Sequence, residues 1–587
     1  MSGIIRNGAE LILNIISHRP YIMRKNAKIA AIVSAAALLA VGASMTAFAV
    51  TGWQEEDGTW VYYNRNGEQV TDKWEKSGDN WFYLDDSGEM ATDSLIEDDD
   101  NYYYVDANGA MVKNQWIAID NEDAGDEDQP DVWWYYFQGN GKAYKNNHSD
   151  GKIFKKVING KTYCFDEDGK MQYGWVKGED GTTNYEDDAF TECEYYFGDE
   201  NDGAMTTGWR EIALTDVSEA DDEQPGDSYW DEDQVRWFWF KSSGKKEYGN
   251  GAGKINKTIN GRKYGFDKYG RMIADWYAKD IEDDLEGAKA SASISRRGNA
   301  ASSANALKEV SKYAESFQYY SSPESGARYT KGWFKVVPGY YLNQGDYDDS
   351  TNRWYYADGT GNLVAGEIKS IKGKKYAFDL KGSMISGLAF LKTDGNDILH
   401  YPDSEDAYDT EDSFKEYARD HKDYGVYFFS DDADHDGTMK TGTQKVVIDG
   451  ESFSFKFAKT GTDKGKGLNG LNDKKYYLGG MLLKADSDDK ICLINVDKAD
   501  EEDYLKTYTV SELIKELDIG KHTVQKDEET EKAKKDDVLY EIDVDALKNY
   551  RVVNTSGSVV GTGTKKDGDG IKVYVYKNQI KEIYSED

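Results

Sequence analysis

A unit of 21 residues occurs three times in succession between residues 50 and 112, and this repeat limits the folds that the chain can adopt. Its shared positions are an opening tryptophan, an aromatic position and a turn glycine: Trp53 and Trp74; Tyr62, Tyr83 and Tyr104; Gly67, Gly88 and Gly109. A unit this short is a supersecondary element, which cannot bury its apolar side chains alone. Successive copies therefore have to stack on one another, as in a solenoid.

Each unit has the local pattern of one β-hairpin. Strand-favouring aromatics fill residues 60–63, between the turns Asp57-Gly58 and Asn66-Gly67. Glycine tolerates the positive φ that tight hairpin turns require. We therefore predict an all-β fold, a solenoid of stacked β-hairpin repeats that begins with three regular 21-residue repeats over residues 50–112.

Residues 113–480 continue the pattern in diverged form. Long copies carry acidic insertions between the opening tryptophan and the aromatic run, as between Trp116 and Trp134. Short copies alternate with them, and their turns are Asn159-Gly160, Asn260-Gly261 and Lys372-Gly373. The Ala/Ser-rich residues 281–316 interrupt the series and favour a solvated loop or a short helix near residues 306–310.

The N-terminal 49 residues have the pattern of a leader. Met23 is followed by a basic segment, an apolar run over residues 29–41, and Ala47-Phe48-Ala49, which is the order of a secretory signal peptide. The apolar run is too short to cross a bilayer core of about 30 Å. We predict cleavage before Val50, secretion, and no transmembrane span in the mature chain.

Residues 481–587 have no tryptophan and a weaker pattern. A hydroxyl cap and apolar spacing predict a short helix over residues 509–517, and residues 551–553 and 571–576 favour strands. Both a small α+β region and degenerate repeats fit this C-terminal stretch.

Charge and reactive residues exclude several classes of function. The formal net charge is −37, and leaving out the five basic residues and one acidic residue of the leader makes it −41, which disfavours nucleic acid as a partner. Three widely spaced cysteines do not form a disulfide framework. The six histidines are isolated, and no HExxH, CxxC, GxSxG or P-loop pattern occurs. We therefore expect no catalytic residues, no metal site and no cofactor.

The regular units resemble a known family. Gly52-Trp53, residues 60–63 and Gly67, with their copies at Trp74, residues 81–83 and 88–90, resemble the cell-wall-binding repeats of Gram-positive surface proteins. That family includes choline-binding modules, glucan-binding domains and the repeat region of large clostridial toxins. In choline-binding members, two aromatics of one hairpin and one of the next form a cage around the ligand, which implies a cage of Trp53, Trp60 and Trp74. The implied ligand-binding positions are Trp53, Trp60, Trp74, Trp81, Trp116, Trp134, Trp209 and Trp237.

The aromatic rings have a physical reason to bind such ligands. A quaternary ammonium gains about 0.5–2 kcal/mol over a ring face, and several weak sites on one polymer give firm attachment. We therefore expect a non-catalytic, secreted protein of the Gram-positive cell wall or surface that binds choline-bearing teichoic acid or peptidoglycan-associated glycan. Three alternatives stay open: the same rings form only the core, the grooves bind host glycans as in a toxin or adhesin, or residues 481–587 hold an unrecognised enzyme site.

Overall fold

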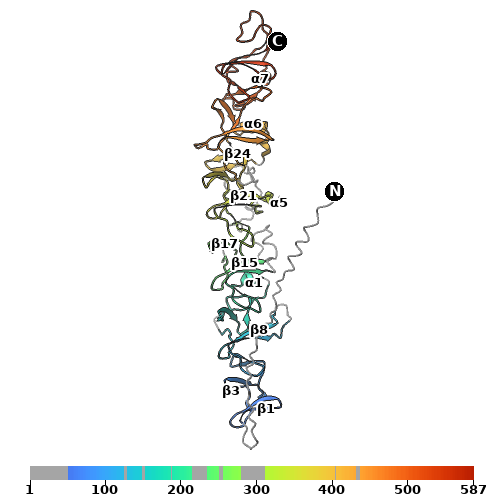
Figure 1. The fold of residues 1–587 in the computed structure, drawn as a ribbon, viewed down its shortest axis with the longest axis vertical. Helices are drawn as coiled ribbons and strands as arrows, with labels where there is room; N and C mark the ends of the chain where they lie inside the picture. The colour runs from blue at the N-terminus through green and yellow to red at the C-terminus, as the bar shows by residue number, and fades with distance from the viewer. Residues whose placement is uncertain are drawn as a thin grey trace, which may run out of the picture. The chain divides into compact units, whose positions relative to one another are not determined.

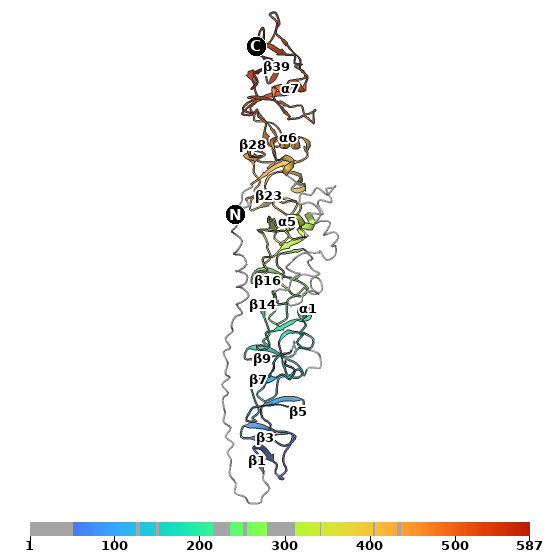
Figure 2. The same ribbon diagram turned by 90° about the vertical axis from the view of Figure 1, so that its right-hand side faces the viewer.

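The computed structural model describes residues 51–124, 129–147, 152–186, 188–214, 235–249, 255–278, 311–340, 342–402, 405–430 and 436–586. They belong to two compact units. The first unit holds Met1–Gln172, Glu179–Thr182 and Glu200–Gly203, and the second holds Tyr173–Gly178, Thr183–Asp199 and Ala204–Asp587. Within each unit, pairs of strands follow one another in sequence order (Figures 1 and 2).

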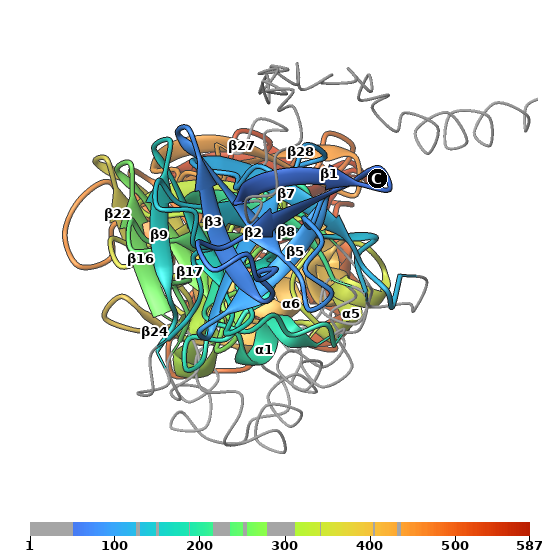
Figure 3. The ribbon, with the colours of Figure 1, turned by 90° about the horizontal axis from the view of Figure 1, so that it is seen from below.

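The first unit is a series of antiparallel hairpins. The three regular repeats form one hairpin each, and Figure 3 shows the second hairpin turned relative to the first rather than in line with it. A fourth hairpin and a three-stranded sheet follow. The strands are β1 (Gly52–Glu56), β2 (Thr59–Tyr63), β3 (Lys73–Ser77), β4 (Asn80–Leu84), β5 (Ser94–Asp98), β6 (Asn101–Val105), β7 (Gln115–Asp120), β8 (Val132–Phe137), β9 (Lys155–Ile158), β10 (Lys161–Phe165) and β11 (Met171–Gln172).

The second unit begins with six more hairpins, of which β16–β17 and β22–β23 have short connections and the other four have long ones. Their strands are β12 (Gly174–Val176), β13 (Tyr195–Phe197), β14 (Gly208–Ala213), β15 (Val235–Phe240), β16 (Ile255–Ile259), β17 (Arg262–Phe266), β18 (Trp276–Ala278), β19 (Phe317–Tyr319), β20 (Gly332–Val336), β21 (Arg353–Ala357), β22 (Ile368–Ile371) and β23 (Lys374–Ala377). The insertions carry short helices, α1 (Ala189–Glu192) and α5 (Gln344–Asp348).

Larger sheets follow the hairpins. A three-stranded sheet has the order β25-β24-β26, and a five-stranded sheet has the order β27-β28-β31-β30-β29. The elements are β24 (Gly387–Asp394), β25 (Asp397–His400), η2 (Glu405–Tyr408), α6 (Glu411–Asp420), β26 (Gly425–Phe429), β27 (Gly442–Ile448), β28 (Glu451–Phe457), β29 (Gly470–Asn472), β30 (Lys475–Leu478) and β31 (Met481–Leu482).

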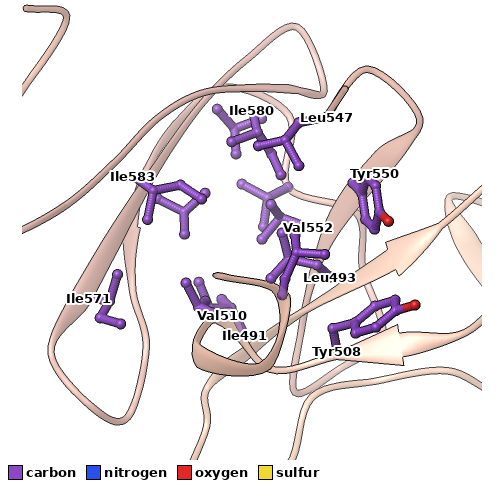
Figure 4. Packing of buried hydrophobic residues seen from close by; sticks show 14 residues of the cluster. Ile491, Leu493, Tyr508, Val510, Leu547, Tyr550, Val552, Ile571, Ile580 and Ile583 are labelled. Carbon is purple, nitrogen blue, oxygen red and sulfur yellow. The ribbon is translucent and has the colours of Figure 1, made fainter. Parts of the chain in front are cut away.

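The C-terminal stretch combines both predicted alternatives. Its helix α7 (Val510–Glu516) starts at Thr509, whose hydroxyl accepts a hydrogen bond from the N–H of Glu512 in a capping box. The helix packs on the apolar cluster shown in Figure 4, which includes Ile491, Val510 and Val552. The strands are β32 (Ile491–Asn495), β33 (Thr507–Tyr508), β34 (Lys521–Thr523), β35 (Val538–Tyr540), β36 (Tyr550–Asn554), β37 (Gly563–Lys566), β38 (Ile571–Tyr576) and β39 (Gln579–Ser585), in sheets of order β33-β32-β36 and β34-β35-β39-β38-β37.

A side-chain turn ends the aromatic strand of most units. In the third regular repeat, Oδ1 of Asp106 accepts hydrogen bonds from the N–H groups of Asn108 at 2.8 Å and Ala110 at 3.0 Å. Asn and Asp favour such turns because their short side chains reach the backbone two residues on. Asn554 makes the same turn with Ser556 and Ser558, which shows that the repeat pattern continues beyond residue 480.

Some predictions cannot be compared with the structure. The leader, the cleavage site and the expected helix near residues 306–310 lie outside the described residues. Within the described residues, no helix has the length and apolarity that crossing a membrane requires. The three cysteines are buried and free, as the absence of a disulfide framework predicted.

Candidate functional site

The eight tryptophans named from the sequence fall into two rows. The opening tryptophans stand on the first strand of a hairpin, and the second-strand tryptophans start the aromatic run. In the first hairpin Trp53 pairs with Tyr62 and Glu55 pairs with Trp60, so both tryptophans lie on one face. The opening row is Trp53, Trp74, Trp116 and Trp209, and the second-strand row is Trp60, Trp81, Trp134 and Trp237.

The opening tryptophans fill the interfaces between consecutive hairpins. Trp53 lies edge-to-face with Tyr62 of its own hairpin and with Phe82 of the next, each at 5.3 Å between ring centroids. Trp74 repeats the arrangement with Tyr83 at 5.1 Å and Tyr103 at 5.2 Å. The diverged copies keep it, because Trp116–Tyr163, Trp209–Tyr264 and Trp333–Tyr376 are each 4.8 Å apart. This row is therefore part of the core that joins one hairpin to the next.

The indole N–H groups of the opening row fit this packing. The Nε1 atoms of Trp53 and Trp74 are buried and have no hydrogen-bond acceptor among the described residues. Edge-to-face geometry directs the positive edge of one aromatic ring at the negative face of another. These N–H groups are therefore buried, although each indole as a whole is partly exposed.

The second-strand tryptophans stand beside a methionine of the following unit. The carbonyl oxygen of Trp60 accepts a hydrogen bond from the N–H of Met90 at 2.7 Å, and that of Trp81 accepts one from Met111 at 2.8 Å. Trp237 and Met272 keep this link at 2.8 Å. The side chain of Trp81 is 37% exposed, and the other three tryptophans of this row are partly buried.

A cavity of about 470 Å³ lies at Trp60, in the first unit. Three successive repeats contribute to it: the start of β2, the segment after β4 and the turn after β6. Its lining combines an indole ring, a thioether, a carboxylate and hydroxyl groups, from Gly58, Thr59, Trp60, Glu89, Met90, Thr92, Ala107 and Asn108. Neither Trp53 nor Trp74 lines it, so the structure does not gather the expected trio of Trp53, Trp60 and Trp74 around this cavity.

The paired tryptophans of the long copies lie close together and are partly buried. Trp209 and Trp237 contact each other edge-to-face at 6.3 Å between centroids. Trp116 and Trp134 pack on the same cluster of Ile158, Phe165 and Met171. These two pairs are thus brought together as the sequence predicted, inside apolar clusters.

The methionine row is a feature that the sequence analysis missed. A Cβ added to Gly109 would lie 2.8 Å from both Cε and Sδ of Met90, and one added to Gly141 would lie 2.3 Å from Sδ of Met111. Each methionine therefore packs under the turn glycine of the next unit. The recurrence of Met90 at Met111 in the same 21-residue register was the signal available in the sequence.

Catalytic and metal chemistry have little support in the described parts of the chain. No group of three His, Cys, Asp or Glu side chains within them could hold a metal ion. Burial raises the pKa of the Cys164 thiol to about 12 and that of Cys492 to about 12, so neither is a thiolate nucleophile near neutral pH.

Comparison with known proteins identifies the regular repeats. The family model of the choline-binding repeat matches residues 50–93 and 73–116. Glucosyltransferase-S of Streptococcus mutans serotype c is 27% identical over 390 residues, which are 62% of this chain and 23% of that protein. The chain thus spans about a quarter of the length of this relative.

Solved structures of choline-binding proteins from Streptococcus pneumoniae also match. Choline binding protein F, in the presence of a peptidoglycan analogue, is 16% identical, with 72% of this chain and 100% of that chain covered and a TM-score of 0.29. The modular autolysin LytC, in complex with a synthetic peptidoglycan ligand, is 15% identical, with 63% and 59% covered and a TM-score of 0.29. The choline-binding domain of CbpL is 21% identical, with 38% and 88% covered and a TM-score of 0.24.

Proposed function

We propose that this chain, whose residues 50–116 belong to the choline-binding repeat family, is a non-catalytic secreted protein that attaches to the wall or surface of a Gram-positive bacterium. Its ligand is choline-bearing teichoic acid or a peptidoglycan-associated glycan. The observation that carries the proposal is the cavity at Trp60. The signal-peptide pattern of the leader supports secretion.

The lining of this cavity suits a quaternary ammonium. The Trp60 ring offers a π face, Met90 a polarisable thioether, and Glu89 a carboxylate that complements positive charge. A cation over an aromatic face gains about 0.5–2 kcal/mol, so one such site binds weakly. Trp81 and Met111 repeat the ring and the methionine one unit later, with Ala110 in the position of Glu89, and a second site there would let one polymer engage two sites and raise the overall affinity.

The charge of the chain selects among wall polymers. With a formal net charge of −37, the chain repels a purely anionic polymer, whereas a choline group carries the opposite charge. A neutral glycan is not repelled either, and its apolar face can stack on the exposed ring of Trp81.

Binding to bacterial sacculi tests the proposal. The purified secreted protein is incubated with sacculi before and after teichoic-acid extraction, with choline as competitor at about 20 mM, a concentration suited to weak sites. We expect retention on intact sacculi, release by choline, and weaker retention of the double variant Trp60→Ala/Trp81→Ala. Tyr185→Ala is the control, because Tyr185 is a ring of the same 37% exposure outside the cavity.

Each other outcome points to a different function. Retention on extracted sacculi that choline does not release indicates stacking on neutral glycan. Absence of binding to any sacculus rejects wall attachment and favours host glycans or protein partners. Release of sugar or of wall fragments by the purified protein would show that the chain is an enzyme.

A further inference from the structure

A second aromatic cavity, of about 360 Å³, lies in the second unit and is built by an insertion. The insertion is the connection between β20 and β21, which carries α5 and lies against hairpin β18–β19. The lining consists of three tyrosines, one tryptophan, one carboxylate and the loop backbone: Asp275, Trp276, Tyr319, Tyr340, Tyr347, Asn352 and residues 336–339. The regular repeats have no counterpart of this insertion.

The walls of this cavity are aromatic rings held in fixed orientations. Trp276 and Tyr319 are cross-strand partners with ring centroids 5.1 Å apart, and Tyr319 stacks on Phe334 at 4.7 Å and 7°. On the insertion, Tyr340 and Tyr347 meet edge-to-face at 5.6 Å and 87°. Aromatic residues of the hairpin and of the insertion therefore line the same space, and an aromatic ring attracts a cation that lies over its face.

Asp275 places a negative charge in this aromatic setting. Its Oδ1 accepts a hydrogen bond from the Tyr319 hydroxyl at 3.3 Å, and none of the ion pairs among the described residues includes Asp275. Burial raises its pKa, and the carboxylate of Glu324 raises it further, while the Tyr319 hydrogen bond acts in the opposite direction. A partly buried carboxylate without a cationic neighbour is costly for the free protein, so a bound cation would compensate it.

The insertion is fixed in place before any ligand binds. Nε1 of Trp276 donates a hydrogen bond to the carbonyl oxygen of Val337 at 2.7 Å. Arg353 holds α5 through two bonds to Asp346, from Nε at 3.0 Å and from the guanidinium at 2.8 Å. The same pair neutralises Arg353, so the guanidinium does not repel a cation as a free charge would. Because the walls are already ordered, little conformational entropy is lost when a ligand enters.

We propose that this cavity is a binding site for an organic ammonium ion, with the ammonium group at Asp275 and its carbon substituents against Trp276, Tyr319, Tyr340 and Tyr347. The site is independent of the cavity at Trp60, because it uses residues of the insertion and lies in the other unit. Two sources present this chemistry, a choline-type quaternary ammonium without N–H groups and a lysine-type primary ammonium with three of them.

Ligand-observed NMR titrations with tetramethylammonium and n-butylammonium test the proposal, in the secreted Trp60→Ala/Trp81→Ala protein, which lacks the two ammonium sites proposed in the first unit. We expect both ions to bind, and the neutral tert-butyl analogue of choline to bind at least tenfold more weakly than choline. Asp275→Asn should weaken both ions about tenfold or more, and Tyr347→Ala about threefold or more. One control should bind as this parent protein does: Asp348→Asn, which removes an exposed carboxylate of α5 outside the cavity.

The outcomes are distinct. Tighter binding of n-butylammonium assigns a lysine-type ligand, and tighter binding of tetramethylammonium assigns a choline-type ligand. The proposal is overturned if neither ion binds to this parent protein, or if Asp275→Asn binds both ions as the parent protein does. If circular dichroism shows that Asp275→Asn does not fold, the binding affinity of Tyr347→Ala for the two ions tests the proposal instead. Failure here leaves the sacculus experiment unaffected, since that experiment reports on Trp60 and Trp81.

Discussion

The indole of Trp53 lies edge-to-face against the ring of Phe82, with centroids 5.3 Å apart and an interplanar angle of 71°. The two residues belong to consecutive hairpins, and Trp74 and Tyr103 repeat the relationship one unit later at 5.2 Å. Each of these two hairpins thus packs its opening tryptophan against an aromatic ring of the next hairpin. This contact converts a row of marginal hairpins into one stacked series.

The two tryptophans of one hairpin should therefore have different roles. We predict that Trp74→Ala lowers the local free energy of unfolding by about 3 kcal/mol, because it removes a ring packed on both sides. Trp81→Ala should cost about 1 kcal/mol or less, because its ring is more than a third exposed, yet it should weaken choline binding. Hydrogen exchange of the β3 and β4 amides measures the first effect, and a choline titration the second. Equal loss of protection in the two variants would contradict this division.

The sequence predicted the hairpins better than it predicted the roles of the tryptophans. The 21-residue offset with Gly turns was sufficient for the strands, because hairpin turns and alternation are local properties. Alternation also places Trp53 and Trp60 on the same face, so it cannot tell a core position from a groove position. That distinction depends on the next hairpin, whose Phe82 covers Trp53 and whose Met90 lies beside Trp60.

The aromatic cavity of the second unit could not be read from the repeat pattern. Tyr340 and Tyr347 lie in an insertion that matches no repeat. They line one cavity with Trp276, whose strand β18 pairs with the distant strand β19. For residues 481–587 the sequence left open a small α+β region or degenerate repeats, and it could not choose between them because valines replace the aromatics before the turn at Asn554. What this segment shares with the other repeats is the side-chain turn of Asn554, not the hydrophobic pattern before it.

Lys246 occupies a methionine position, and this substitution is predicted to limit stability. Its bridge to Phe240 corresponds to that of Met272 to Phe266. The side chain is 2% exposed, donates to the carbonyl oxygen of Phe190, and lies 5.3 Å above the Trp175 ring. Burial lowers the pKa of Lys246 from its usual 10.5 to about 8.

The sign of the pH effect follows from this shift. Between pH 8 and 10.5 the unfolded chain binds a proton that the folded chain does not, so stability rises with pH in that window. Below pH 8 the buried ammonium costs the fold about 3 kcal/mol. We predict that Lys246→Met raises stability at pH 7 by about 1–3 kcal/mol and removes the rise above pH 8. Thermal unfolding at pH 7 and pH 10 measures both, with Lys245→Met, whose exposed ammonium pairs with Glu194, as control. A less stable Lys246→Met variant at pH 7 would show that the bond to Phe190 dominates.

The side-chain turn after each aromatic strand gives a third prediction. Asp106→Ala removes both hydrogen bonds to the backbone of Asn108 and Ala110, and we expect a loss of about 1–2 kcal/mol. Asp106→Asn should be nearly neutral, because Asn64 forms the same turn in the first repeat, with Asn66 at 2.8 Å. Hydrogen exchange of the β5 and β6 amides distinguishes the two variants. Equal destabilisation by Ala and Asn would show that the carboxylate charge, and not the acceptor oxygen, matters.

The contact between Gly141 and Met111 gives the last prediction. A double-mutant cycle separates two causes of the destabilisation by Gly141→Ala, the backbone strain and the clash with Met111. Gly141 has a φ of +84°, and an added Cβ would lie 2.3 Å from Sδ of Met111. Gly141→Ala should destabilise the fold by about 1–2 kcal/mol from the backbone conformation alone. It should cost a further amount from the clash with methionine. Met111→Ala in the same chain removes the clash but not the strain, so we expect the double variant to lose less than the two single losses added together. Strict additivity, measured by urea unfolding, would mean that the methionine side chain moves aside freely, and that the fit of methionine under glycine does not set the spacing between these repeats.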